Sequence, residues 1–172
     1  MERFRQIGNK TIRRIGYWLL AIGTLCGCDN KYHYIPKDIE PISVNIVRFD
    51  SALLAVRTDS ALQDVVQLYA DYEAFMPVYV EGVLRLPMAD TAYFSQQLAT
   101  FLTDTTMGFA QTNALSQRHF AHIDTIQTLL NTAFSRLHYL YPDWTIPTVY
   151  MFVSGFNSTV FYYDDMLGVG ID

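Results

Sequence analysis

The sequence predicts an α+β fold in which several packed helices lie against a small, mostly antiparallel sheet. The first observation is an apolar spacing typical of helices, which recurs through most of 58–141 between capping residues and prolines. The second is that β-branched and aromatic residues concentrate at 43–49 and 148–172. The chain has 172 residues, of which 51% are hydrophobic, with 12 Tyr and 11 Phe. This length and composition are sufficient for a single domain with its own core.

The first expected strand spans 43–49, where side-chain character alternates and β-branched residues are frequent. The alternation places Val44, Ile46 and Arg48 on one face and Val47 and Phe49 on the other.

Capping residues indicate two helices after this strand. Asp50 offers an N-cap for a short helical turn, and Thr58–Ser60 opens a longer helix. Pro77 is expected to kink or end that longer helix, and 78–84 to add a further turn or two. The apolar stripe of the longer helix consists of Leu62, Val65, Val66, Tyr69, Tyr72, Phe75 and Met76.

Two more helical regions are expected before the sheet resumes. Asp90 caps a third helix, and 105–141 holds helix in two pieces that meet near 121–124. Pro142 and Pro147 end the second piece. The apolar stripes are Phe94, Leu98, Phe101 and Leu102 in the third helix, then Ile126, Leu129, Leu130, Ala133, Phe134, Leu137 and Leu140 in the last piece.

The C-terminal third supplies most of the expected sheet. Strands are predicted at 148–153 and 160–163, and a third begins at Met166 after a turn at Asp164–Asp165. This last strand would end one residue after Ile171, without a polar tail or a covering helix. Two interpretations follow: the strand is a frayed edge, or the chain is the front part of a longer protein.

The N-terminal residues resemble an export signal followed by a lipid-attachment cysteine. A basic stretch precedes an apolar run at 15–25, which is roughly 16 Å long as a helix at ~1.5 Å per residue. Because a spanning helix needs about 20 residues, 1–27 is expected to be a signal peptide. Cys28 follows a small residue in a pattern that resembles the bacterial lipobox, whose cysteine is acylated, for example with palmitate. Cys26 fits less well because bulky Leu25 precedes it, and the alternative is an uncleaved anchor with two incidental cysteines.

Cleavage before Cys28 would leave a tether at 28–42 and a domain at 43–172. The remaining chain would carry seven basic and 16 acidic residues, a formal net charge near −9. This balance argues against a nucleic-acid partner, which would need clustered Lys and Arg. The expected partner is instead a membrane, reached through acylated Cys28.

No catalytic, cofactor-binding or metal-binding residue is predicted. His119 and His122 lie three apart on an expected helix and could face one metal, but the spacing supplies no third ligand. Solvated histidines are therefore the favoured interpretation. Asp164–Asp165 could bind a hard cation, although a turn between strands accounts for the acidic pair without one.

Other residues with chemical potential also have simpler interpretations. Gly168 and Gly170 lack the third glycine and the helix of a nucleotide loop, and are expected as strand glycines. Ser154 lacks the strand-to-helix elbow of a hydrolase nucleophile. Core and sheet packing accounts for most of the aromatic excess at Tyr150, Phe152, Phe156, Phe161, Tyr162 and Tyr163.

Several of these segments together resemble GldB, the gliding-motility lipoprotein family of the Bacteroidota. The most specific are Pro147–Asn157 and Leu167–Asp172, which contain Ser-Gly-Phe-Asn and Gly-Val-Gly-Ile-Asp. Val47–Asp50 is similar to the opening strand and turn of the family, and Phe134–Pro142 to its long helix with an aromatic-proline end. The lipobox at Cys28 also matches.

The resemblance implies a cell-envelope lipoprotein related to gliding motility or type IX secretion, which acts through protein contacts without catalysis. Its partners would be other envelope proteins of that apparatus, and Cys28 its modified residue. Family members continue with Tyr-Leu-Gly and further helices, so the resemblance implies that 43–172 is the N-terminal part of a longer domain.

Two other functions stay open at this point. The family distantly resembles zincin-type metallopeptidases, and the chain could be a membrane-anchored peptidase fragment that lacks its metal-binding helix. No His-Glu-x-x-His occurs in this sequence. A weaker alternative is a lipoprotein that binds a ligand on the aromatic sheet.

Overall fold

The computed structural model describes residues 36–172 except 37, 87–90, 107 and 159. These residues belong to one compact unit that spans 35–172. The expected signal peptide, Cys28 and most of the expected tether lie outside the described residues.

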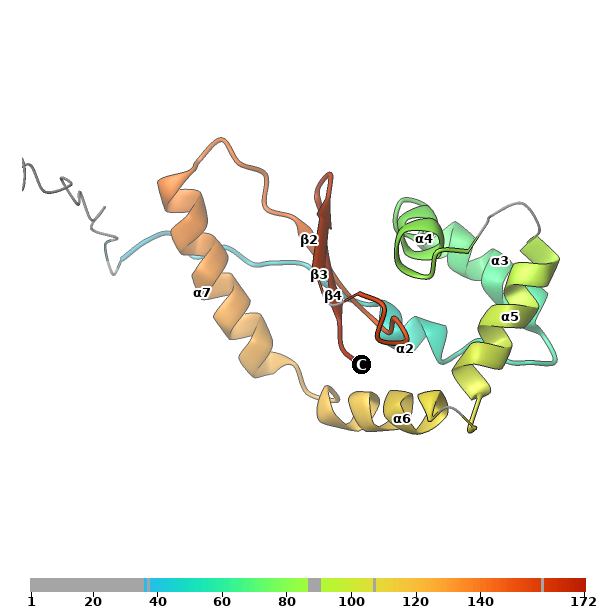
Figure 1. Ribbon diagram of the computed structural model, residues 1–172. Coiled ribbons are helices and arrows are strands. Elements are labelled where there is room, and N and C mark those ends of the chain that lie inside the picture. Colours follow the sequence, from blue (N-terminus) through green and yellow to red (C-terminus); the bar gives the residue numbers. More distant parts are fainter. Residues whose placement is uncertain (1–35, 37, 87–90, 107, 159) are drawn as a thin grey trace, which may run out of the picture. The chain divides into compact units, whose positions relative to one another are not determined.

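Six helices, one π-helical segment and four strands occur in the described residues. In chain order they are β1 (Ile46–Arg48), α2 (Phe49–Leu53), α3 (Ala61–Asp71), α4 (Phe75–Pro77), the π-helical η1 (Val78–Val83), α5 (Thr91–Thr103), α6 (Phe109–His119), α7 (Asp124–Leu140), β2 (Thr148–Phe152), β3 (Val160–Tyr163) and β4 (Met166–Gly170). The α+β prediction is confirmed, with helices packed against a small sheet (Figure 1).

The prediction of a mostly antiparallel sheet is wrong. The strand order is β1-β2-β4-β3, in which β1 and β4 both run parallel to β2 and only β3 is antiparallel to its neighbour. The reason is that the chain passes from β2 to a position one strand further along, where it forms β3, so that β4 returns between β2 and β3. The last strand is therefore an interior strand, and the interpretation of it as a frayed edge is also wrong.

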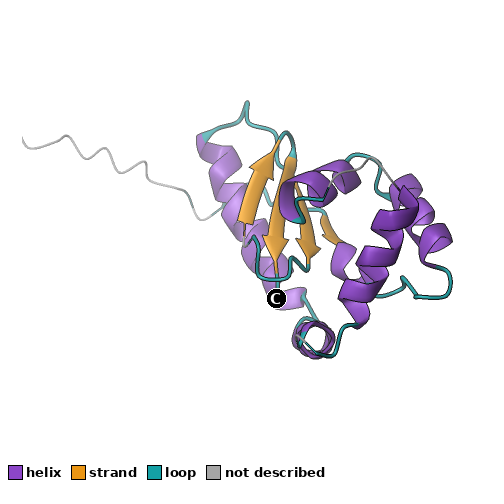
Figure 2. Cartoon of the chain, turned by 45° about the vertical axis from the view of Figure 1, so that its right-hand side comes forward, coloured by secondary structure: helices purple, strands orange, loops and turns teal. Residues whose placement is uncertain are grey.

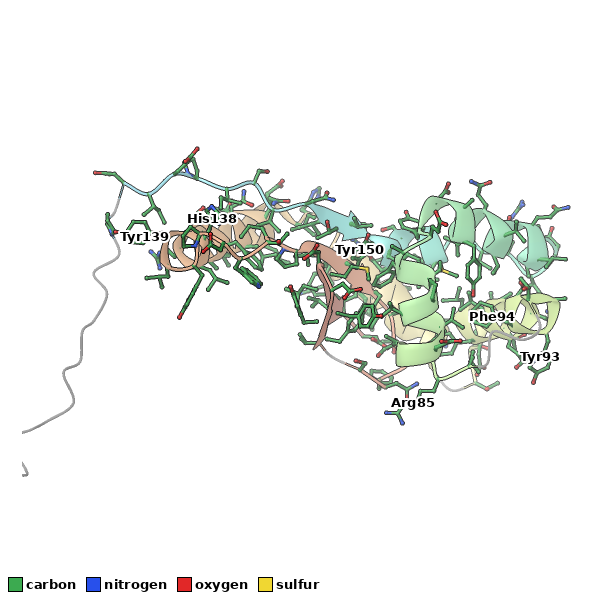
Figure 3. The ribbon with its side chains drawn as sticks, turned by 90° about the horizontal axis from the view of Figure 1, so that it is seen from above. Arg85, Tyr93, Phe94, His138, Tyr139 and Tyr150 are labelled. Atoms are coloured by element: carbon green, nitrogen blue, oxygen red, sulfur yellow. The ribbon has the colours of Figure 1, made fainter. Side chains whose placement is uncertain are left out.

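The sheet packs against helices on both faces (Figure 2). Tyr150 of β2 faces α4, where its ring stacks on Phe75 with 4.1 Å between ring centroids (Figure 3). Val149, the preceding residue, faces Phe134 of α7 on the other side. Burial on both faces is typical of parallel strands, which explains why β2 has no simple apolar–polar alternation.

The larger core is centred on Phe49 at the start of α2. Its ring packs edge-on against Tyr72, Phe75 and Tyr79, with centroids 4.8–5.1 Å apart. Aromatic pairs at these distances add about 0.5–1.5 kcal/mol beyond their buried area. Phe49 thus fixes the end of β1 against the turns around α4 and η1.

The helix predictions were right in position and partly wrong in detail. The pieces α6 and α7 meet at the expected break, but α3 ends at Asp71, well before Pro77. This break lets the residues of α4 turn toward Phe49. Leu62 and Val66, expected in the buried stripe of α3, are about half exposed, because the helix buries the neighbouring face of Ala61, Val65 and Leu68.

Gly168 allows the ring of Phe161 to pack directly on the backbone of β4. A Cβ built on Gly168 would lie 2.2 Å from the ring of Phe161 on the neighbouring strand. This contact confirms the prediction of a strand glycine that permits close approach.

Gly168→Ala is expected to lower the free energy of unfolding by about 1–3 kcal/mol, because the new methyl group would have to displace a packed ring. Gly82→Ala in η1 is the matched control, since the nearest side-chain atom to its new Cβ would be 3.9 Å away. Urea unfolding of the two variants measures the difference. Equal stability of both variants would contradict the close packing of Phe161 on Gly168.

Candidate functional site

The two segments with the most specific sequence pattern fold into one polar loop. Gly155 and Phe156 both have positive φ, 65° and 62°, so that the backbone after β2 curls around the carboxylate of Asp172. The amide of Ser154 donates to Oδ1 at 2.9 Å, and the amide of Phe156 donates to Oδ2 at 2.9 Å. Ser-Gly-Phe-Asn and Gly-Val-Gly-Ile-Asp are therefore two halves of one structure.

The hydroxyl of Ser154 is engaged on all sides in this loop. It donates to Asp172 Oδ1 at 3.1 Å and accepts the amides of Asn157 and Ser158 at 3.1 and 3.3 Å. Ser154 is almost fully buried, and the carboxylate that accepts its proton, that of Asp172, also accepts the amides of Ser154 and Phe156. The arrangement supports a loop-forming role for Ser154 and gives it no nucleophile geometry.

Buried hydroxyls hold the two chain segments that lead into this loop. Tyr79 of η1 donates to the carbonyl of Val153 at 2.9 Å, and Ser116 of α6 donates to the carbonyl of Ile171 at 2.8 Å. Burial, with a smaller contribution from the charge of Asp172, raises the pKa of Tyr79 far above its ordinary value. The Tyr79 hydroxyl therefore stays protonated and can donate this hydrogen bond at neutral pH.

A second polar cluster joins β1 to α6. Asp50 is fully buried, and both of its carboxylate oxygens accept from Arg48, at 2.8 Å to Nε and 2.6 Å to Nη2. The side-chain amide of Gln117 also donates to Asp50, and Arg48 donates to the carbonyl of Phe120. The hydrogen bond to Asp50 raises the pKa of the Arg48 guanidinium. Through these hydrogen bonds, the Arg48–Asp50 pair joins the end of β1 to the C-terminal part of α6.

The role of this pair was not predicted from the sequence. Asp50 was expected to cap a helix from outside, but Arg48 takes the N-cap position and Asp50 lies in the first turn with its carboxylate bound by Arg48. The alternation of 43–49 offered one signal, since it places Arg48 on the same face of β1 as Ile46.

The remaining candidate residues are not brought together. His119 ends α6 with its ring against Phe120, and His122 lies exposed in the connection to α7. Asp164–Asp165 form the predicted turn between β3 and β4. Among the residues that the structure describes, no three His, Cys, Asp or Glu side chains are grouped as metal ligands.

A comparison with known families decides what this chain is related to. The family described as gliding motility protein GldB matches residues 32–172. The chain belongs to the GldB family. Both polar clusters lie within the matched region, and GldB is a family of lipoproteins related to gliding motility.

Searches of curated proteins and of solved structures gave no significant match. Within the described part of the chain, no helix has the length and apolar character needed to cross a bilayer.

Asp172→Ala is expected to release the amides of Ser154 and Phe156 and to lower the free energy of unfolding by about 1–3 kcal/mol. Hydrogen exchange measured by mass spectrometry should show faster exchange at 154–157. Asp143→Ala, at an exposed carboxylate, serves as the control and should change neither quantity. Unchanged exchange at 154–157 in Asp172→Ala would show that the carboxylate does not hold the loop.

Asp50→Ala is expected to lower the free energy of unfolding by about 3–5 kcal/mol, because it leaves the Arg48 charge without its partner in a partly buried site. The double variant Arg48→Met, Asp50→Ala should lose less than the sum of the two single variants. A double-mutant cycle by urea unfolding measures this coupling. Additive losses would refute a direct interaction between the two side chains.

Proposed function

We propose that this GldB-family protein is held on a membrane of the cell envelope by acylated Cys28 and acts through protein contacts, without catalysis. Its role would be in gliding motility or in the type IX secretion apparatus, with other envelope proteins as partners. The observation that carries the proposal is the family match, which begins at residue 32, four residues after the lipobox-like Cys28.

The polar groups of the described domain support a role without catalysis. Ser154, Asp172 and Asp50 would be the natural candidates for a nucleophile or an acid–base pair, and each is occupied by hydrogen bonds within the fold. Such internally paired groups stabilise a loop or join two elements, whereas a catalytic group must keep an atom available to the substrate.

Lipid anchoring would act by confining the domain near its partners. Each buried CH₂ of an acyl chain contributes about 0.8 kcal/mol, so that two or three chains on Cys28 would hold the protein on a bilayer almost permanently. Confinement to the membrane plane raises the effective concentration for any membrane-bound partner. A modest contact surface on the domain is then sufficient for assembly.

Cys28→Ser is expected to abolish labelling by a fatty-acid analogue and to leave a precursor with its signal segment uncleaved, as seen by mass spectrometry. Cys26→Ser is the matched control, because it removes a thiol from the same segment and should leave labelling and processing normal. Normal lipid labelling of Cys28→Ser would overturn the proposed anchor.

A further inference from the structure

The two edges of the sheet differ in how their backbone groups are satisfied. Just before β1, two side chains of α7 bind the backbone of Val44. The Val44 N–H donates to Asn131 Oδ1 at 2.9 Å, and the Val44 carbonyl accepts from Gln127 Nε2 at 2.7 Å. Side chains of α7 thus take the place of a further strand at this edge. Proteins commonly protect an exposed edge in this way, since unpaired strand groups attract other chains.

The backbone of β3, at the other edge, has outward groups without such partners. At the two ends of β4, the carbonyl of Asp165 and the amide of Ile171 form hydrogen bonds with β2. Since the backbone groups of successive residues point to opposite sides of a strand, the N–H and C=O groups of Met166 and Gly168 face β3. Their register partners are Tyr163 and Phe161. By alternation, the N–H and C=O groups of Val160 and Tyr162 point away from the sheet. No hydrogen bond joins these outward groups to the part of the chain that the structure describes.

The side chains of β3 are unusually exposed for an apolar strand. Val160, Tyr162 and Tyr163 are 60%, 51% and 54% exposed, and β3 contains no charged residue and no proline. A hollow of about 210 Å³ lies beside the strand, where Val78 and Gly82 of η1 form the opposite wall. An uncharged edge strand next to an apolar hollow has none of the usual protection against pairing.

The charge at one end of this edge indicates what would pair with it. Asp164 and Asp165, at the turn directly after β3, are both exposed, and neither forms an ion pair with another described residue. A chain that pairs with β3 in the more stable antiparallel direction would place its N-terminal residues beside these carboxylates. Basic residues there would complement the acidic turn.

We propose that the outer edge of β3 binds an extended segment of a partner protein as a fifth strand, with apolar residues at alternate positions and Lys or Arg at its N-terminal end. Main-chain hydrogen bonds to Val160 and Tyr162 would supply affinity, and the hollow beside η1 and the acidic turn would supply selectivity. A second copy of this chain is a poor occupant, because two domains with a strong negative charge repel each other. The inference specifies the contact surface of the proposed function.

The test uses the full chain, purified in detergent, and the synthetic peptide Lys-Lys-Val-Thr-Val-Thr-Val with an amidated C-terminus. The peptide should bind in a titration followed by NMR, with the largest shifts at 160–165. Peptides that begin with Glu-Glu, or that carry Pro in place of both Thr, should bind at least about fivefold more weakly. The first loses charge complementarity and the second loses main-chain donors.

Two protein variants test the same contact from the other side. Val160→Pro removes one outward N–H at the first residue of β3, where proline is tolerated, and should weaken binding about fivefold. Val160→Thr is its control and should bind as the parent chain does. Asp164→Asn with Asp165→Asn should abolish the preference for Lys-Lys over Glu-Glu, and Asn tolerates the positive φ of 49° at Asp164.

Binding at this edge with these losses supports the proposal. Absence of binding would overturn it. The same dependence on peptide charge in the parent chain and in the Asp164→Asn, Asp165→Asn variant would also overturn it. Self-association through β3 in sedimentation of the parent chain would also overturn it and would identify a second copy as the occupant. Lipid labelling of Cys28 is a separate measurement. Failure of the peptide titration would therefore overturn the edge contact and leave the proposed anchor standing.

Discussion

The whole domain depends on a parallel pairing between strands from its two ends. β1 pairs with β2 from Ile46↔Val149 to Arg48↔Met151, and all the helices from α2 to α7 lie between these strands in sequence. A parallel pair needs a long crossover and burial on both faces. The helices meet both requirements, since α4 covers one face of β2 and α7 covers the other.

Two polar clusters add directional hydrogen bonds to this apolar packing. Arg48 and Asp50 connect the end of β1 to α6, and the Asp172 carboxylate closes the loop that follows β2. The Arg48–Asp50 charge pair is specific in geometry even where the net stabilisation from such a pair is modest. In this GldB-family domain, Asp172 and the Arg48–Asp50 pair thus have a structural role.

Much of the fold could be predicted from sequence because local signals were strong. The α6–α7 break and the three C-terminal strands were predicted correctly from prolines, β-branched runs and the acidic turn. Strand order could not be predicted, because nothing local shows that the chain passes over one position in the sheet between β2 and β3. The buried face of α3 was partly mispredicted, since Leu62 and Val65 are both apolar and only the tertiary contacts choose between them. The link from Asp50 to α6 could not be predicted, because Gln117 is distant in sequence, and the capping interpretation of Asp50 hid its pairing with Arg48 two residues earlier.

The two edges of the sheet differ in whether their outward backbone groups have hydrogen-bond partners within the described domain, and the proposed contact surface depends on this difference. Hydrogen exchange of single amides, measured by NMR on the unliganded protein, tests this difference directly. The account predicts slow exchange at Val44, Phe161 and Tyr163, whose amides face Asn131 or β4, and fast exchange at Val160 and Tyr162. Slow exchange at Val160 and Tyr162 would show that the outer edge of β3 is already covered, and would contradict the account.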